Sequence, residues 1–196
     1  KDEGYRTAFF GKSHFRADLQ EMGFDAGPNY QEMKVSDEEA RAGGFEYAPG
    51  GARRAHHAAS RDAVAWLRDY EPGDDPLFFF FSTNLPHSPM HWVPEHQHRF
   101  PVESMKLPRS FYEETFEGKP PFLKEHMEDG HHGAIDEDHT KLQMAQYYSM
   151  IAAADQVHGK MIAEFKRLGL WENTIVLFFS DHGDMMGGHK MRAKGT

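Results

Sequence analysis

The chain alternates between short apolar blocks and longer amphipathic segments. A short strand-like segment occurs at 5–10 and apolar runs at 77–81 and 174–179, and polar, glycine or proline residues bound them. Such runs predict strands, and the last two are apolar enough to be buried on both faces. Segments 53–70 and 142–168 repeat apolar residues at three- and four-residue steps, which predicts two helices.

The order of these elements is strand, helix, strand, long polar segment, helix and strand. Helices between strands imply parallel crossover connections. The sequence therefore predicts an α/β fold, an α/β sandwich with a mostly parallel sheet, within a single domain over residues 1–196. Residues 92–140 are rich in Pro, Glu, Asp and His, so we expect a long surface excursion or insertion there.

Composition excludes several classes of protein. A net charge of −9 argues against a nucleic-acid partner, which would favour a basic face. No apolar run approaches the roughly 18–20 residues that span a membrane as a helix. The chain has no cysteine, so it contains neither a disulfide nor a nucleophile made from cysteine.

Polar motifs follow each of the three predicted strands, where ligands gather in open α/β sheets. Asp181 and His182 follow the third strand. A carboxylate and an imidazole can both bind a divalent cation, and histidine extends the range toward Mn, Fe or Zn. The alternative is a turn with a capping aspartate and a structural histidine.

The other motifs suit an anionic group. His87 lies between two prolines, so a stiff loop could hold its ring to bind an anionic oxygen or to protonate a leaving group. Lys12 and His14 share the loop after the first strand, and a lysine is a point charge suited to sulfate or phosphate. Taken singly, each motif, and Lys194 too, also fits an ordinary solvated turn.

The order of the motifs resembles that of the sulfatase family. Residues 4–15 resemble the family's Gly-Tyr-x-Thr segment running into Gly-Lys-x-His, and 78–89 resemble its apolar strand ending in Pro-His-x-Pro. Residues 147–196 resemble its long helix, its Gly-Leu-x-x-Asn-Thr-Ile-Val strand, Ser-Asp-His-Gly-Asp and a closing Lys-Gly-Thr. The resemblance implies a partial alkaline-phosphatase-like α/β/α sandwich.

The resemblance also implies roles for individual residues. Asp181 and His182 would be two ligands of a single divalent metal. This metal is usually calcium in the family, and manganese is the alternative. Lys12 and Lys194 would bind sulfate oxygens and offset their charge. His14 would assist the nucleophile and the breakdown of the sulfated intermediate. His87 would bind sulfate and support the departing alcohol.

The family's nucleophile is a formylglycine made from cysteine in Cys-x-Pro-x-Arg, a motif absent from this sequence. We expect that motif, and an aspartate pair completing the metal site, upstream of Lys1. The family's C-terminal subdomain is also expected elsewhere, so the chain by itself should be inactive. The substrate class would be small-molecule or glycan sulfate esters, and a periplasmic or secreted location fits the family.

Two other functions stay open. A phosphonate monoester or phosphodiester hydrolase of the same superfamily shares the Asp-His metal pair. A non-catalytic fragment that binds an anion or a metal is a reading of a different class. The specific ester and the oligomeric state cannot be read from the residues.

Overall fold

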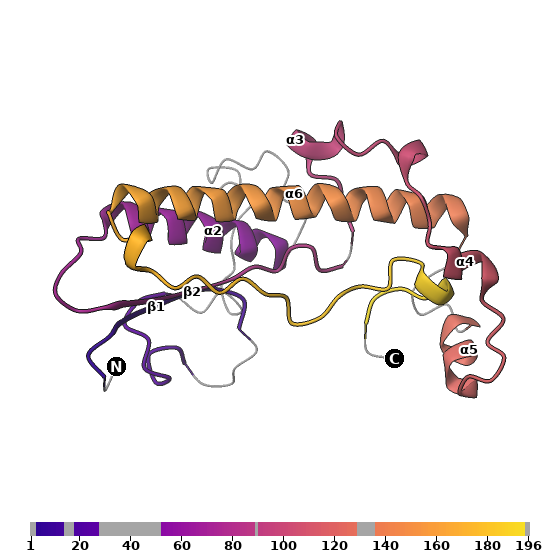
Figure 1. Cartoon of the computed structure of the whole chain (residues 1–196), viewed down its shortest axis with the longest axis horizontal. Coiled ribbons are helices and arrows are strands. Elements are labelled where there is room, and N and C mark those ends of the chain that lie inside the picture. Colours follow the sequence, from indigo (N-terminus) through magenta and orange to yellow (C-terminus); the bar gives the residue numbers. More distant parts are fainter. Residues whose placement is uncertain (1–2, 14–17, 28–51, 89, 129–135, 195–196) are drawn as a thin grey trace. The chain divides into compact units, whose positions relative to one another are not determined.

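The computed structural model describes residues 3–13, 18–27, 52–88, 90–128 and 136–194. These residues form two compact units: Lys1–Leu85 with Ala153–Ile175, and Pro86–Ala152 with Val176–Thr196. The regular elements, labelled in Figure 1 where there is room, are β1 (Arg6–Gly11), α2 (Ala52–Asp69), β2 (Leu77–Ser82), α3 (Pro94–Gln97), η1 (Val102–Ser104), α4 (Arg109–Glu113), α5 (Pro121–Glu128), α6 (Glu137–Arg167), η2 (Trp171–Asn173) and η3 (Gly188–Lys190).

The first unit is built on a parallel pair of strands. Strand β1 pairs with β2 in parallel from Arg6 opposite Leu77 to Gly11 opposite Ser82. The crossover between them carries α2, as a parallel connection requires. The first two predicted strands, the helix between them and their parallel arrangement are therefore confirmed.

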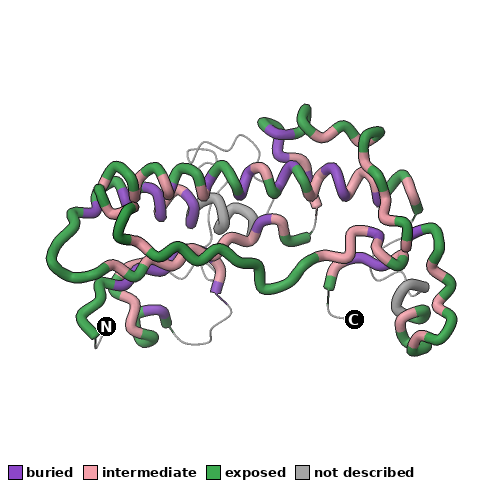
Figure 2. Tube along the Cα trace, viewed as in Figure 1, coloured by how far each residue is buried: buried purple, intermediate pink, exposed green. Residues whose placement is uncertain are grey.

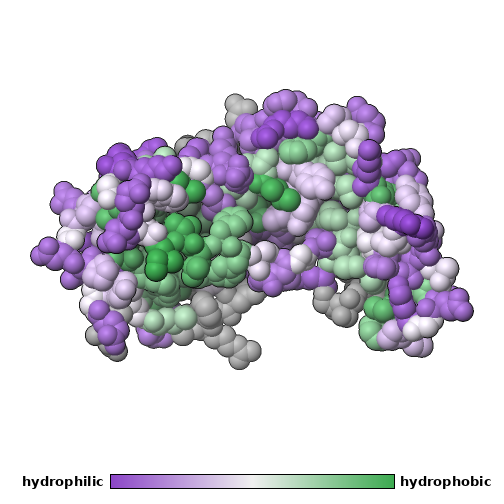
Figure 3. Space-filling model, viewed as in Figure 1, coloured by the Kyte–Doolittle hydropathy of each residue, from purple (hydrophilic) through white to green (hydrophobic). Residues whose placement is uncertain are grey.

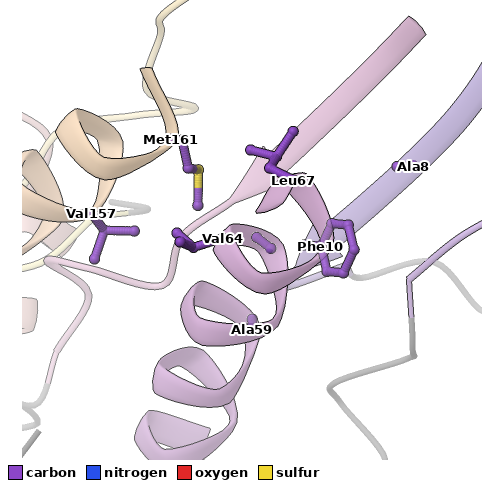
Figure 4. Packing of buried hydrophobic residues seen from close by; sticks show 8 residues of the cluster. Ala8, Phe10, Ala59, Val64, Leu67, Val157 and Met161 are labelled. Atoms are coloured by element: carbon purple, nitrogen blue, oxygen red, sulfur yellow. The ribbon is translucent and has the colours of Figure 1, made fainter. Parts of the chain in front are cut away.

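One apolar cluster holds this unit together. Side chains of β1, α2 and the C-terminal part of α6 form it, and Figure 4 shows Val157 and Met161 of α6 facing Val64 and Leu67 of α2. Leu67 is fully buried, so truncating it to alanine would cost about 2–5 kcal/mol. The sequence predicts one apolar stripe along α6: Tyr147, Ile151, Ala154, Val157, Met161, Phe165 and Leu168. Ala154, Val157 and Met161 of this stripe are buried, whereas Ile151 is exposed.

Gly11 ends β1 in a conformation that only glycine adopts easily. Its φ is +117°, and a Cβ built on it would lie 1.9 Å from the Ser82 carbonyl oxygen. The next residue, Lys12, donates its backbone N–H to that oxygen at 2.9 Å. The close approach of the two strand ends therefore depends on a missing side chain.

We expect Gly11→Ala to destabilise the chain by more than about 2 kcal/mol, because strained backbone and a backbone clash add together. Gly159→Ala is the matched control. Gly159 lies inside α6 with open space around its missing Cβ, so alanine there should stabilise by about 0.5–1 kcal/mol. Urea unfolding measures the change in the free energy of unfolding for each variant. Changes of the same sign and size in the two variants would contradict the expectation.

The second unit contains the N-terminal part of α6 and the short helices of residues 92–140. Ser149 of α6 is fully buried and accepts the Val93 N–H at 3.2 Å through its hydroxyl oxygen. The same hydroxyl donates to the Gln146 carbonyl at 2.8 Å. This contact ties the segment after β2 to the helix. The expected excursion is thus a chain of short helical turns in its described part.

The predicted buried strand at 174–179 is wrong. The structure places no strand there, and the segment leaves Ile175 91% and Leu177 80% exposed. Figure 2 shows the chain after α6 as a largely exposed trace, and Figure 3 shows apolar residues gathered on the surface of the same face. A strand needs neighbours to pair its backbone groups, and in the described residues the sheet consists of β1 and β2 alone.

Within the described residues, no helix is both long and apolar enough to cross a membrane. The longest helix, α6, is amphipathic rather than uniformly apolar, with acidic residues in its first turn and basic residues in its last. Those charges are favourable at the respective ends of the helix dipole. These charges therefore stabilise the helix itself.

Candidate functional site

His87 lies in the loop that follows β2, with its side chain exposed. Its Nδ1 is 2.7 Å from the carbonyl oxygen of the next residue, Ser88. A carbonyl oxygen only accepts hydrogen bonds, so in the neutral ring Nδ1 carries the proton and Nε2 keeps its lone pair. The short contact therefore fixes both the tautomer and the orientation of the ring.

Asp181 and His182 follow the exposed segment at 174–179. The Nδ1 of His182 is 2.9 Å from the Gly183 carbonyl oxygen, so its neutral ring also presents a lone pair at Nε2. That Nε2 is 3.3 Å from Oδ2 of Asp181, while the other carboxylate oxygen of Asp181 accepts the His182 backbone N–H at 3.0 Å. The two side chains therefore turn an oxygen and a nitrogen toward the same space.

Lys194 joins the two histidines. Its Nζ lies 2.8 Å from Nε2 of His182 and 3.3 Å from Nε2 of His87. An ammonium group donates three hydrogen bonds, and both rings offer a lone pair, so the contacts are complementary. Four predicted site residues, distant in the sequence, thus come together in the second unit: His87, Asp181, His182 and Lys194.

Lys194 is presented by a closed turn, residues 184–193, which we call the return loop. The Asp184 carboxylate accepts the backbone N–H of Met186 at 3.0 Å and of Ala193 at 3.1 Å. The Met185 N–H donates to the Ala193 carbonyl at 3.0 Å. One carboxylate therefore holds the start of the loop to its end, immediately before Lys194.

The structure does not place the other two predicted site residues relative to this group. Lys12 belongs to the first unit, where it follows β1 beside the end of β2. His14 lies outside the described residues. Their expected convergence with the four residues of the second unit stays a prediction.

Asp181 and His182 fit part of a metal site. Two ligands at right angles on a cation with bond lengths of about 2.1–2.5 Å lie about 3.0–3.5 Å apart, which matches their 3.3 Å separation. The backbone carbonyl on Nδ1 of His182 is the usual orienting partner of a metal-binding histidine. In the described part of the chain, no third His, Cys, Asp or Glu joins them as a ligand group.

Comparison with known families decides the class. The family model described as Sulfatase matches residues 1–196. The chain belongs to the sulfatase family. The motif order that indicated the family from the sequence alone is thereby confirmed.

Curated relatives carry related names. This sulfatase chain is 28% identical over 210 residues to an ulvan-active sulfatase of Formosa agariphila, covering 98% of the chain and 35% of the relative. It is 27% identical over 131 residues to the multifunctional alkaline phosphatase superfamily protein PehA of Trinickia caryophylli, covering 61% of the chain and 26% of the relative. The chain thus spans about a third or less of these relatives.

Solved structures confirm the fold. A phosphonate monoester hydrolase of Agrobacterium radiobacter matches 100% of the chain and 48% of its own length, with a TM-score of 0.69 and 21% identity. A protein solved in complex with its substrate D-glucosamine-2-N,6-O-disulfate matches 97% of the chain and 50% of its own length, with a TM-score of 0.67 and 18% identity. The sulfatase chain therefore has the α/β, alkaline-phosphatase-like fold that its sequence predicts.

Sequence reasoning missed a charged cluster that joins the segment after α4 to the return loop of this sulfatase chain. The Glu114 carboxylate contacts the Lys119 ammonium and lies 2.6 Å from Nδ1 of His189 through the same oxygen. Its other oxygen accepts the Phe116 N–H at 2.6 Å. We call Glu114, Lys119 and His189 the anchor cluster. Glu114 and His189 are 75 residues apart, so no local pattern reveals the pair.

The anchor cluster lowers the pKa of Glu114 from 4.5 to about 2, first through the Lys119 hydrogen bond and then through the Phe116 N–H. A carboxyl whose folded-state pKa is lowered stabilises the fold above its unfolded pKa. That contribution is lost as the pH falls from about 4.5 toward about 2.

We therefore expect Glu114→Gln to lower the free energy of unfolding near neutral pH. In acid, the variant and the wild-type chain should become equally stable. Denaturant unfolding of both chains across this pH range measures the difference in free energy. Glu113→Gln, one position earlier on an exposed side chain, is the matched control for a charge change on the same helix. A difference for Glu114→Gln that persists undiminished in acid would contradict the expectation.

Proposed function

We propose that this chain forms one side of the active site of a sulfuric ester hydrolase. The observation that carries the proposal is the Lys194 ammonium held between the Nε2 atoms of His87 and His182, with the Asp181 carboxylate beside it. A cation between two imidazole rings held by backbone carbonyls suits a tetrahedral anion bearing an ester oxygen. Membership of the sulfatase family supports the same chemistry.

Each side chain then has a role in the reaction. Lys194 binds a sulfate oxygen and offsets charge that grows in the transition state. His87 holds its proton on Nδ1 in the neutral ring; once Lys194 turns to the sulfate, Nε2 can accept a proton from solvent, hydrogen-bond the ester oxygen through it and pass it to the departing alcohol. Lys12 and His14 are proposed to serve the same anion and the nucleophile.

Asp181 and His182 are proposed to hold one divalent cation, calcium or alternatively manganese. When bound, such an ion acts as a Lewis acid toward the sulfate oxygens. Asp181 supplies a hard oxygen, and His182 supplies Nε2 once Lys194 turns to the substrate. The 3.3 Å spacing of the two atoms supports a shared ion.

The nucleophile is proposed to be a formylglycine. It forms from cysteine, and the chain has none, so the residue has to come from outside these 196 residues. We therefore expect the purified chain to show no turnover of an aryl sulfate. Turnover by the chain itself, retained after removal of contaminating enzymes, would contradict this assignment.

The substrate class is proposed to be small-molecule or glycan sulfate esters. One structural neighbour binds a sulfated glucosamine, and one relative is named for activity on ulvan. A second function, phosphonate monoester hydrolysis, is favoured by the neighbour with a TM-score of 0.69.

The full product of the gene tests the two functions. Its kcat/KM for an aryl sulfate is compared with that for an aryl phosphonate monoester under identical conditions. A sulfate preference of tenfold or more, about 1.4 kcal/mol in the transition state, supports the sulfatase proposal. A preference of tenfold or more for the phosphonate would instead support phosphonate monoester hydrolysis, the second function.

A further inference from the structure

The return loop, residues 184–193, needs an external anchor because its backbone is strained. Met186, His189, Lys190 and Ala193 all have positive φ, between 42° and 59°, although none is glycine. Left-handed conformations of this kind are unfavourable for residues other than glycine, and they persist only where the surroundings enforce them. The Asp184 carboxylate closes the two ends of the loop, but it does not hold the tip.

The tip is held by α4 and the turn that follows it. Strained His189 places Nδ1 2.6 Å from Oε2 of Glu114, and its backbone N–H donates to the Ser110 hydroxyl at 3.3 Å. Figure 1 shows η3 beside α4, in agreement with their contacts. The Glu114 side chain is only 4% exposed, which strengthens its charged hydrogen bonds.

The loop is also packed where it meets α6. A Cβ on Gly187 would lie 2.8 Å from Cγ2 of Thr140 and 3.3 Å from the ring of Phe111. Buried Arg192 reaches toward the Thr140 hydroxyl at 3.4 Å. The loop therefore has little freedom to shift once its tip is anchored, and its last residue leads directly to Lys194.

We propose that Glu114 is a positioning residue for Lys194, acting through His189 and the return loop. The inference rests on the proposed role of Lys194 as a sulfate ligand. Glu114 does not contact the anion site. Its carboxylate fixes the loop tip, the closed loop fixes Ala193, and the next residue then presents its ammonium to His87 and His182.

Nuclear magnetic resonance of the full 196-residue chain tests this directly. The ring Hε1 signals of His87 and His182 report the Lys194 ammonium, since each ring lies within hydrogen-bond distance of it. Glu114→Ala should move both signals in the direction that Lys194→Met moves them. In a Lys194→Met background, Glu114→Ala should move neither signal further, because both changes act through one contact.

Two variants keep the test decisive. Glu114→Gln preserves the side chain's shape while removing its charge, and it should give a smaller shift of the same sign if Glu114→Ala does not fold. Glu113→Ala breaks the exposed ion pair with Arg109 on the same helix and should leave both ring signals unchanged. The proposal would be overturned if both ring signals kept their wild-type chemical shifts in the Glu114 variants. It would also be overturned if Glu114→Ala still moved the signals in the Lys194→Met background.

A titration with inorganic sulfate separates this inference from the proposed function. Glu114→Ala should weaken sulfate binding about tenfold, because it displaces the Lys194 ammonium that binds the sulfate. Added to Lys194→Met, it should weaken sulfate binding no further. If sulfate moves neither ring signal in the wild-type chain, the anion site fails. The coupled ring shifts would still establish that Glu114 positions Lys194. If sulfate binds equally well to both chains, the positioning role fails.

Discussion

Replacing Lys194 with methionine in the full product of the gene should lower kcat/KM for a sulfate ester by about 10²–10³-fold. This is the usual effect of removing one positioned donor from a site where negative charge develops. The ammonium lies against two imidazole nitrogens in the structure, so methionine removes the charge while keeping a side chain of similar length.

The control for this prediction is Lys160→Met. Lys160 is exposed on α6 and belongs to the first unit, so it should change kcat/KM by less than about twofold. The rate should fall through kcat as well as KM, because a transition-state contact is lost. An unchanged kcat/KM for Lys194→Met would remove the lysine from the proposed site.

Replacing Asp181 with alanine should abolish binding of a divalent cation by this pair of residues. It should also lower sulfate ester hydrolysis by about 10³-fold or more, since a catalytic metal contributes several kcal/mol. Calorimetric titration with Ca²⁺ and with Mn²⁺ measures the first effect, and steady-state kinetics of the full product measures the second.

Asp155→Asn serves as the matched control for loss of a carboxylate. Asp155 is exposed on α6 and is not among the residues proposed as ligands, so metal affinity and activity should stay at wild-type values. His182→Ala should reproduce the Asp181 effect because the two side chains present atoms 3.3 Å apart. Wild-type metal affinity in Asp181→Ala would show that the cation is held elsewhere.

The elements that the sequence predicts well are those set by local periodicity. The strand at 5–10, the strand at 77–81 and the two long helices all match the structure to within a few residues. The prediction fails at 174–179, where the apolar composition is that of a strand. The composition of a segment indicates that it is able to form a strand. Whether it does so depends on a neighbouring strand with which its backbone can form hydrogen bonds.

Of the candidate site, the sequence predicts a set of residues that lie close together in the structure, and their chemical roles stay predictions. Strand-end reasoning and family resemblance together single out His87, Asp181, His182 and Lys194, and the structure places these four side by side. What the sequence does not reveal is how Lys194 is held. The Glu114–His189 contact joins residues 75 positions apart, and neither residue stands in a recognisable motif.

The exposed stretch 174–179 has a consequence for how separate copies of the chain behave toward one another. It is six residues of threonine, isoleucine, valine, leucine and phenylalanine, without charge or proline. Short segments of this composition are the ones that stack between identical molecules into cross-β assemblies. Asp181 and Glu172 flank it closely, and such charges act as gatekeepers that oppose in-register stacking. We therefore expect replacement of Asp181, which is also proposed as a metal ligand, to increase aggregation of the chain.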